Sequence, residues 1–136
     1  MSAIFASLMC QLQSGDHVVS ATALFGSCRE ILKNIITKYG IEVNFVDGKN
    51  VENWKKAIKP NTKVFFFETP SNPCLELVNI EAVCELAKKN NIKVVVDNIL
   101  VSPVLQNPSE FGADIIVYSG AKHIDCLLYT SPSPRD

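Results

Sequence analysis

Three short runs of consecutive apolar residues constrain the fold of this chain more than any other feature. The runs are Val-Phe-Phe-Phe at 64–67, Val-Val-Val at 94–96 and Ile-Ile-Val-Tyr at 115–118. A strand that is apolar on both faces is typical of a parallel sheet that helices cover on both sides. Helical patterns separate the runs, so the chain is expected to be an α/β protein with a doubly wound, largely parallel sheet.

The alternation of strands and helices extends over most of the chain. Apolar residues at helical spacing predict four helices. Asn50 and Asn79 are typical N-caps, and Gly40 is a typical helix stop. The expected strands are residues 17–20, 41–46, 62–67, 92–97 and 114–118, and the expected helices are residues 1–12, 24–39, 51–58 and 80–90.

The composition excludes several classes of partner and site. The net charge of −1 gives no electrostatic basis for binding nucleic acid or an anionic membrane. No apolar run approaches the ~20 residues of a membrane-spanning helix, and the first residues lack the basic segment of a signal peptide, so a cytoplasmic location is expected. The cysteines form no CxxC pair and no metal-like spacing with either histidine, which favours reduced thiols and no bound metal. They are Cys10, Cys28, Cys74, Cys84 and Cys126.

Both ends of the chain depart from this pattern. The first helix begins at Met1 with no N-cap and no strand before it, as expected of a chain that starts inside a longer domain. The last eleven residues, 126–136, read CLLYTSPSPRD and match one reading frame of a transposase sequencing-library adapter. We therefore expect residues 126–136 to be a non-native tail that takes no part in the fold.

Two charged residues follow two of the buried strands. Asp97 comes directly after the 94–96 run, and Lys122 lies four residues after the 115–118 run. Ligands of open parallel sheets bind beyond the carboxyl ends of the strands. A buried lysine amine can become neutral and attack an aldehyde, and a carboxylate can keep a pyridine nitrogen protonated. Taken singly, Asp97 could cap a turn and Lys122 could be a solvated loop lysine, but in this order they favour a pyridoxal phosphate site.

Three motifs carry a resemblance to a known family. They are ETPSNPCLE at 68–76, VVVDN at 94–98 and YSGAKHID at 118–125. In this order, they closely resemble the Cys/Met-metabolism (trans-sulfuration) family of fold-type-I pyridoxal phosphate enzymes. The resemblance implies pyridoxal 5′-phosphate as cofactor. It also implies that residues 1–125 are part of the large cofactor-binding domain of the aspartate-aminotransferase-like fold.

Carried over by position, the resemblance also implies roles for single residues. Lys122 is expected to form the Schiff base with the cofactor, and Asp97 to pair with its pyridinium nitrogen. Ser119 is expected to bind the phosphate through its hydroxyl group. Met1 stands directly after the place of a Ser-Gly pair in the family, where backbone amides hold the phosphate.

Two further residues are expected to contact the ring of the cofactor. Asn72 resembles the asparagine that the family places beside the ring oxygen. Phe25 stands where the family stacks an aromatic side chain, often tyrosine, on the ring. Phenylalanine can stack but cannot donate a proton, and it is found in the sulfhydrylase branch of the family.

The activity implied by the resemblance is a replacement reaction on a homoserine ester. The opening AIFASLMCQL and the KHID after the lysine are most similar to the O-succinylhomoserine sulfhydrylase branch. That reaction replaces succinate by sulfide and gives homocysteine for methionine biosynthesis. Cystathionine γ-synthase, cystathionine γ-lyase or methionine γ-lyase chemistry is the alternative, and a non-catalytic α/β binding module is a second. The partner is expected to be a small amino-acid substrate, and the full-length parent a homotetramer or homodimer.

Three departures from the family pattern bear on this chain. Ala121 stands where the family usually has a threonine before the lysine, which removes a possible phosphate ligand. The Ser-Gly pair before Met1 is absent, and so is the family's C-terminal domain after Asp125. That domain carries the arginine that binds the substrate carboxylate in the family. The 136-residue product by itself is therefore expected to be inactive.

Overall fold

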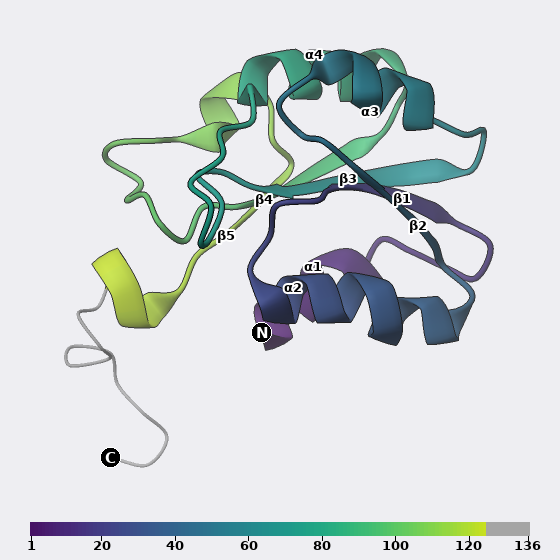
Figure 1. The fold of residues 1–136 in the computed structure, drawn as a ribbon, viewed down its shortest axis with the longest axis horizontal. Helices are drawn as coiled ribbons and strands as arrows, with labels where there is room; N and C mark the ends of the chain where they lie inside the picture. Colours follow the sequence, from purple (N-terminus) through teal and green to yellow (C-terminus); the bar gives the residue numbers. More distant parts are fainter. Residues whose placement is uncertain (125–136) are drawn as a thin grey trace.

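The computed structural model describes residues 1–124, and a five-stranded sheet runs through their centre (Figure 1). The strand order is β2-β1-β3-β4-β5, and every neighbouring pair is parallel. The predicted α/β class with a parallel, doubly wound sheet is thus confirmed. The strands are β1 (His17–Ala21), β2 (Glu42–Val46), β3 (Thr62–Glu68), β4 (Lys93–Asp97) and β5 (Ile115–Val117).

Helices cover the two faces of the sheet as separate layers. The helices α1 and α2 lie on one face, and α3 and α4 lie on the other (Figure 1). The chain passes from β1 to β2 on one side of β1 and then crosses to β3 on its other side, so the strand order reverses between β1 and β3. The helices are α1 (Ser2–Met9), α2 (Gly26–Glu30), α3 (Val51–Ala57) and α4 (Ile80–Lys89), with short helical turns η1 (Ile31–Ile35), η2 (Ile36–Tyr39), η3 (Pro108–Phe111) and η4 (Gly120–Ile124).

Two hydrophobic cores follow from the alternation of side chains along each strand. Val18, Phe66 and Val95 point toward α1 and α2, whereas their neighbours Phe65 and Val94 point toward α3 and α4. Successive side chains of a strand face opposite sides of the sheet, so a run that is apolar at every position supplies both cores. This explains why the central strands contain no alternation with polar residues.

Trp54 organises the core beneath α3 and α4. Its ring lies 5.1 Å from the ring of Phe65 and 5.7 Å from that of Phe67, in tilted and edge-on arrangements. The indole Nε1–H donates to the carbonyl of Gly48 at 3.1 Å. This hydrogen bond satisfies the polar atom of a side chain that is fully buried.

The predicted helix ends are confirmed at three positions. The Oδ1 of Asn50 accepts the amide of Glu52 at 3.0 Å, and the Oδ1 of Asn79 accepts the amide of Ala82 at 3.1 Å. Gly40 has a φ of 77°, the left-handed conformation that ends many helices. Each of these is a local effect, which a sequence pattern reports well.

The expected helix 24–39 differs from the observed structure. It begins at Gly26 and divides into α2, a π-type turn at η1 and a 3-10 turn at η2. The β-branched residues Ile31, Ile35 and Ile36 restrict side-chain rotamers in an α-helix, which weakens regular helix there. A 3-10 turn, η3, also occurs in the connection before β5, where no helix was expected.

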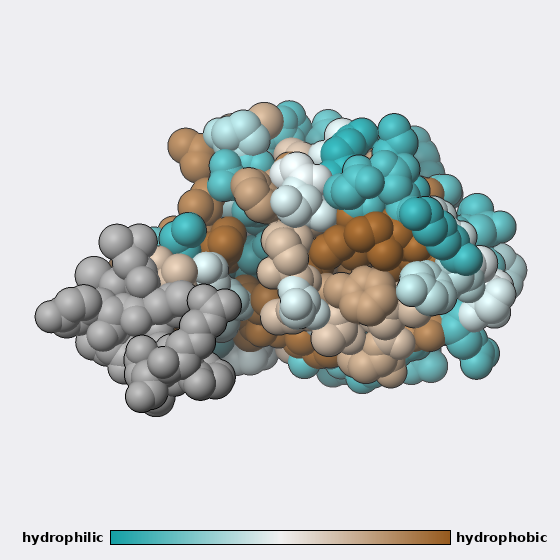
Figure 2. Space-filling model, turned by 90° about the horizontal axis from the view of Figure 1, so that it is seen from below, coloured by the Kyte–Doolittle hydropathy of each residue, from teal (hydrophilic) through white to brown (hydrophobic). Residues whose placement is uncertain are grey.

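The outer surface of the α1 and α2 layer remains partly apolar. Viewed from that side, hydrophobic surface occupies the middle of the face and hydrophilic surface its edges (Figure 2). Phe5 and Met9 of α1 and Ile35 are only partly buried against the core. Within residues 1–124, no helix is long and apolar enough to cross a membrane.

Candidate functional site

The candidate site lies at the carboxyl ends of the strands, near the point where the strand order reverses. Glu68 at the end of β3 pairs in register with Asp97 at the end of β4, and Asp97 pairs with Val117 at the end of β5. In a parallel sheet, paired positions place their side chains on the same face. Asp97 and Glu68 therefore lie side by side on the face that α1 and α2 cover.

Asp97 is a buried carboxylate, 4% exposed. The thiol of Cys28 donates to its Oδ2 at 3.6 Å. Burial raises the pKa of Asp97, and the Cys28 thiol, the Ile99 amide and the chain's N-terminal ammonium partly oppose this shift. Among residues 1–124, no lysine, arginine or histidine side chain forms an ion pair with Asp97. A buried carboxylate in this situation is a strong acceptor for a cation or a charged N–H group.

Glu68 is even more completely buried, with 0% of its surface exposed. Its Oε2 accepts the backbone N–H of Phe25 at 2.7 Å, whereas its Oε1 has no hydrogen-bond partner of good geometry among the described residues. Burial raises the pKa of Glu68, and the nearby charge of Asp97 raises it further. The backbone amides of Asn72 and Phe25 act in the opposite direction.

Phe25 lies at the start of α2, above Glu68. Its backbone is extended, with φ −57° and ψ 137°, and the helix begins at the next residue, Gly26. The side chain is 40% exposed, although it is large and apolar. An aromatic ring that is partly exposed next to two buried carboxylates is well placed to stack on a planar ligand.

Cys28 completes this group from the next turn of α2. Burial, followed by the charges of Asp97 and Glu68, raises the pKa of its thiol to about 12. The thiol is therefore a neutral hydrogen-bond donor at ordinary pH and a poor nucleophile. The motifs gave no signal for Cys28, although its place three residues after Phe25 puts it on the helix face that points at the sheet.

The loop that carries Asn72 is held by its own hydrogen bonds. Leu75 donates its amide to the carbonyl of Ser71 at 2.7 Å, and the amide of Ser71 donates to the carbonyl of Glu76 at 3.0 Å. The amide of Glu76 also donates to Ser71 Oγ at 3.0 Å. Asn72 is partly buried and is followed by a cis peptide bond to Pro73.

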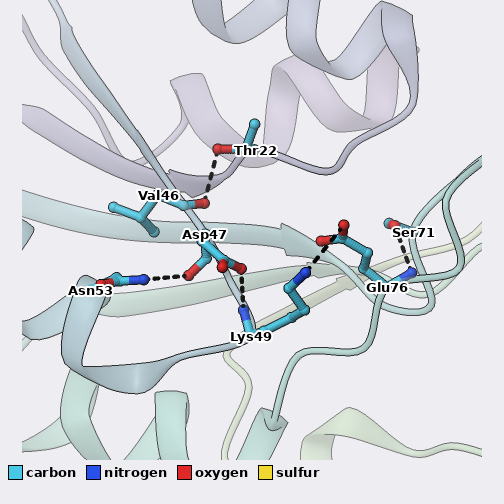
Figure 3. Close-up of polar contacts among 7 residues, drawn as sticks. All are labelled: Thr22, Val46, Asp47, Lys49, Asn53, Ser71 and Glu76. Atoms are coloured by element: carbon cyan, nitrogen blue, oxygen red, sulfur yellow. Dashed lines mark hydrogen bonds and ion pairs between the residues drawn. The ribbon is translucent and has the colours of Figure 1, made fainter.

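The turn after β2 supports this loop from the other side (Figure 3). Lys49 Nζ lies 3.5 Å from Glu76 Oε1, and the amide of Lys49 donates to Asp47 Oδ1 at 3.1 Å. The Oγ1 of Thr22 donates to the carbonyl of Val46 at 3.0 Å, which joins the ends of β1 and β2. The segments after β1, β2 and β3 are thus tied together along one edge of the sheet.

A second polar network holds the segment after β4. Asn98 is fully buried, and its Nδ2 donates to the carbonyl of Gln106 at 3.0 Å and to the hydroxyl of Tyr118 at 3.2 Å. Gln106 returns a bond from Nε2 to Asn98 Oδ1 at 2.6 Å and another to the carbonyl of Thr69 at 2.8 Å. Gln106 was missed at the sequence level, because a lone glutamine in a loop carries no signal of its own.

Lys122 lies beyond the end of β5, in the turn η4. Its amide donates to the carbonyl of Ser119 at 3.2 Å, and His123 Nε2 lies 3.1 Å from the carbonyl of Leu100. The Lys122 side chain is exposed, unlike the buried amine that the proposed chemistry suggests. The difference arises because η4 projects past the edge of the sheet, where nothing in residues 1–124 covers it (Figure 1).

The predicted site residues are therefore brought together to different degrees. Asp97 and Phe25 both lie next to Glu68, and the backbone amide of Asn72 lowers the pKa of the Glu68 carboxyl. Ser119 is partly buried in the segment that leads to Lys122. Met1 is exposed at the start of α1, and its ammonium group is close enough to affect the pKa of Asp97.

A cavity of about 530 Å³ lies elsewhere, between α4 and η3. Its lining includes Cys84 of α4, together with Lys93 and Asp114 at the amino-terminal ends of β4 and β5. Lys93 and Asp114 already form an ion pair at 2.6 Å. This cavity is at the opposite edge of the sheet from Asp97 and is not part of the candidate site.

Comparison with known proteins places the chain in a family. Residues 1–126 match the model of the Cys/Met metabolism PLP-dependent enzyme family. The chain is 46% identical over 125 residues to O-succinylhomoserine sulfhydrylase of Mycobacterium tuberculosis, covering 92% of this chain and 31% of that protein. It is 44% identical over 126 residues to L-methionine gamma-lyase of Fusobacterium nucleatum, covering 92% of this chain and 32% of that protein.

A solved structure supports the same assignment. The chain superposes with a TM-score of 0.85 and 33% identity on a candidate O-acetylhomoserine (thiol)-lyase of Campylobacter jejuni, whose structure holds N′-pyridoxyl-lysine-5′-monophosphate. The match covers 89% of this chain and 30% of that one. The chain spans about a third of the length of the relatives that it matches. With its parallel sheet and its three motifs in family order, the chain belongs to the Cys/Met metabolism family of PLP-dependent enzymes, which have the aspartate-aminotransferase-like fold.

Proposed function

We propose that the complete gene product that carries this sequence binds pyridoxal 5′-phosphate at the carboxyl edge of the sheet and acts on a homoserine ester. The observation that carries the proposal is the environment of Asp97. Asp97 is a buried carboxylate at the end of a central strand, and no cation among residues 1–124 pairs with it. A protonated pyridine nitrogen would supply the missing partner, so this residue fits the cofactor.

When bound, pyridoxal 5′-phosphate supplies an aldehyde for an amine and a protonated ring that accepts electrons. The Asp97 carboxylate would hold the proton on the ring nitrogen, and the Cys28 thiol, 3.6 Å away, would orient that carboxylate. The Phe25 ring would stack on one face of the cofactor and exclude water from it. The Asn72 side chain would lie beside the ring oxygen.

Residues near the two ends of the described chain would bind the phosphate and supply the reactive amine. The Ser119 hydroxyl and the backbone amide of Met1 would donate to the phosphate. Lys122 Nζ would attach the cofactor and then move a proton at the carbon atoms of the substrate. Because the Lys122 side chain is exposed in residues 1–124, this role requires that other parts of the complete protein cover it.

The reaction that we favour is the replacement of succinate by sulfide on O-succinylhomoserine, which gives homocysteine. Support comes from the similarity to the Mycobacterium tuberculosis sulfhydrylase, at 46% identity. A lyase reaction on methionine is the second candidate, because the similarity to L-methionine gamma-lyase is nearly as high, at 44% identity. The two reactions differ in their need for sulfide.

The first test locates the cofactor on the protein. The complete gene product is incubated with pyridoxal 5′-phosphate, reduced with borohydride, and digested for peptide mass spectrometry. We expect the added mass on Lys122 and its loss in Lys122→Ala. Lys38→Ala is the matched control, since Lys38 is an exposed lysine at the end of η2, and it should keep the label. A label on another lysine would contradict the assignment of Lys122.

The second test separates the two reactions. The purified protein is given O-succinylhomoserine with sulfide, and separately methionine alone. Homocysteine in the first mixture supports the replacement reaction, whereas a keto acid formed from methionine without sulfide supports the lyase. A complete protein that binds no pyridoxal phosphate would instead support the alternative of a non-catalytic binding module.

A further inference from the structure

We propose that Glu68 is a positioning residue of this site, which holds Phe25 in place through its backbone amide and so sets the ring that stacks on the cofactor. The inference rests on the proposed binding of pyridoxal phosphate. Glu68 would not touch the reacting atoms. It would act through Phe25, which does contact the cofactor in the proposal.

The geometry links the two residues directly. Glu68 Oε2 accepts the Phe25 amide at 2.7 Å, a short bond from a charged acceptor to a backbone donor. Phe25 takes an extended conformation, and α2 begins directly after it. The carboxylate thus fixes the residue at which the chain turns into the helix. A side chain whose own backbone is held at this point has few ways to reorient.

The bond also lies in the row of groups that forms the site. Glu68 pairs in register with Asp97. The Oδ2 of Asp97 accepts from the thiol of Cys28, which lies in α2, the helix that begins after Phe25. Phe25 and Cys28 therefore sit over neighbouring carboxylates, one on each of two adjacent strands. A shift at Phe25 would be transmitted to the ring face of the cofactor, while Asp97 would keep its own contact.

The burial of Glu68 argues against a role in stability alone. The side chain is fully buried beside a second carboxylate, and its Oε1 has no partner of good geometry among the described residues. Burying a carboxylate with an unsatisfied oxygen costs free energy, and an apolar side chain of the same size would often be at least as stable. A group that is unfavourable for folding and sits next to a candidate site is better explained by function.

The experiment uses three variants of the complete gene product and a double-mutant cycle. Glu68→Gln keeps an oxygen that can accept the Phe25 amide, whereas Glu68→Met keeps the volume and removes the acceptor. Phe25→Ala removes the ring, and Phe25→Ala with Glu68→Met closes the cycle. Glu85→Ala, at an exposed glutamate in α4, is the matched control. The readouts are the Kd for pyridoxal phosphate by equilibrium dialysis, the visible circular dichroism of the bound cofactor, and the thermal midpoint.

If Glu68 acts through Phe25, Glu68→Met weakens cofactor binding by about tenfold and reduces the circular dichroism band, while the protein stays folded. Glu68→Gln stays within about threefold of the wild type, and Glu85→Ala binds as the wild type does. In the Phe25→Ala background, Glu68→Met causes no further loss, because the ring that it positions is gone.

Three results would overturn the inference. Losses from Glu68→Met and Phe25→Ala that add fully would show that Glu68 acts independently of the ring. A Glu68→Gln variant as weak as Glu68→Met would assign the effect to charge instead of to the bond with Phe25. Failure of the wild-type protein to bind pyridoxal phosphate would overturn the proposed function and this inference together, and is recognised by the wild-type measurement alone.

Discussion

At the scale of single residues, burial sets the chemistry of the ionisable groups. Asp97, Glu68 and Cys28 all have raised pKa values, with burial as the largest cause. His17 shows the opposite shift, since burial disfavours the charged form of a base and lowers its pKa from 6.5. In each case burial in the fold shifts the equilibrium toward the neutral form of the group.

His17 is fully buried at the start of β1, at the other edge of the sheet from the candidate site. Its Nδ1 lies 2.7 Å from Thr62 Oγ1, which also accepts the amide of Lys59 at 2.7 Å. The charge of Lys59 adds to the lowering of the His17 pKa, while Asn44 and Glu42 oppose it. The folded state therefore disfavours the charged form of this histidine.

We predict that His17 makes the protein less stable as the pH falls. Above 6.5 the histidine is neutral in both states, so its contribution to folding is complete. Below that value the unfolded chain binds a proton that the folded chain does not, and stability decreases until the pH reaches the lowered pKa of the folded state. Urea unfolding between pH 7.5 and 5.5 measures this, and His17→Asn should show a smaller decrease than the wild type.

His123→Asn is the control for this measurement, because His123 is exposed. The stability of His123→Asn should change with pH as the stability of the wild type does. Asp97 and Glu68 titrate in all three proteins, so their effect cancels in the comparison. Equal slopes for His17→Asn and the wild type would contradict the prediction.

At the scale of the elements, helix ends and connecting loops are determined mostly by local chemistry. Asn50 and Asn79 cap α3 and α4 through their own side chains. Gly40 ends the helical segment before β2, and its amide bonds to the carbonyl of Thr37 at 3.1 Å. By contrast, the start of α2 depends on Glu68, which is distant in sequence.

We predict that Gly40→Ala destabilises the fold by about 1 kcal/mol or more, because a side chain strains the left-handed backbone there. A Cβ at Gly40 would also crowd the side chain of Ser14. Gly26→Ala is the matched control: its φ is not in the left-handed region, and a Cβ there meets no atom within 4 Å. Chemical denaturation should show a loss for Gly40→Ala and little change for Gly26→Ala. Equal free energies of unfolding for the two variants would contradict this account.

At the scale of the whole molecule, one sheet supports two cores. The same strands send Phe66 toward α1 and α2, and Phe65 toward α3 and α4. A substitution that removes packing contacts in one core should therefore destabilise the strands that also form the other core. Trp54, the only tryptophan of the chain, lies entirely in the second core and reports on it.

We predict that Phe66→Ala lowers stability by about 3–5 kcal/mol, although Phe66 lies in the core that lacks Trp54. Urea unfolding followed by Trp54 fluorescence and by far-ultraviolet circular dichroism should shift to the same lower midpoint, since the two cores unfold together. Val104→Ala, at a side chain that is 91% exposed, should leave both midpoints unchanged. Separate transitions for the two probes would show that the layers are independent.

Much of the fold and part of the site could be predicted from the sequence. The apolar runs at 64–67 and 94–96 determined the buried strands, because a period of two places their side chains in both cores. Asn50 and Asn79 determined two helix starts through bonds to amides two or three residues away. The three motifs placed the chain in its family, and the match over residues 1–126 confirmed this.

Only the tertiary structure decided which groups meet. The thiol of Cys28 reaches Asp97, and the amide of Phe25 reaches Glu68, across separations of 69 and 43 residues that no local pattern reports. The exposure of Lys122 was likewise invisible in the motif around it, because burial depends on what packs over a residue. Local chemistry thus determined the elements and the motifs, whereas the arrangement of strand ends and helix starts in space determined the candidate site.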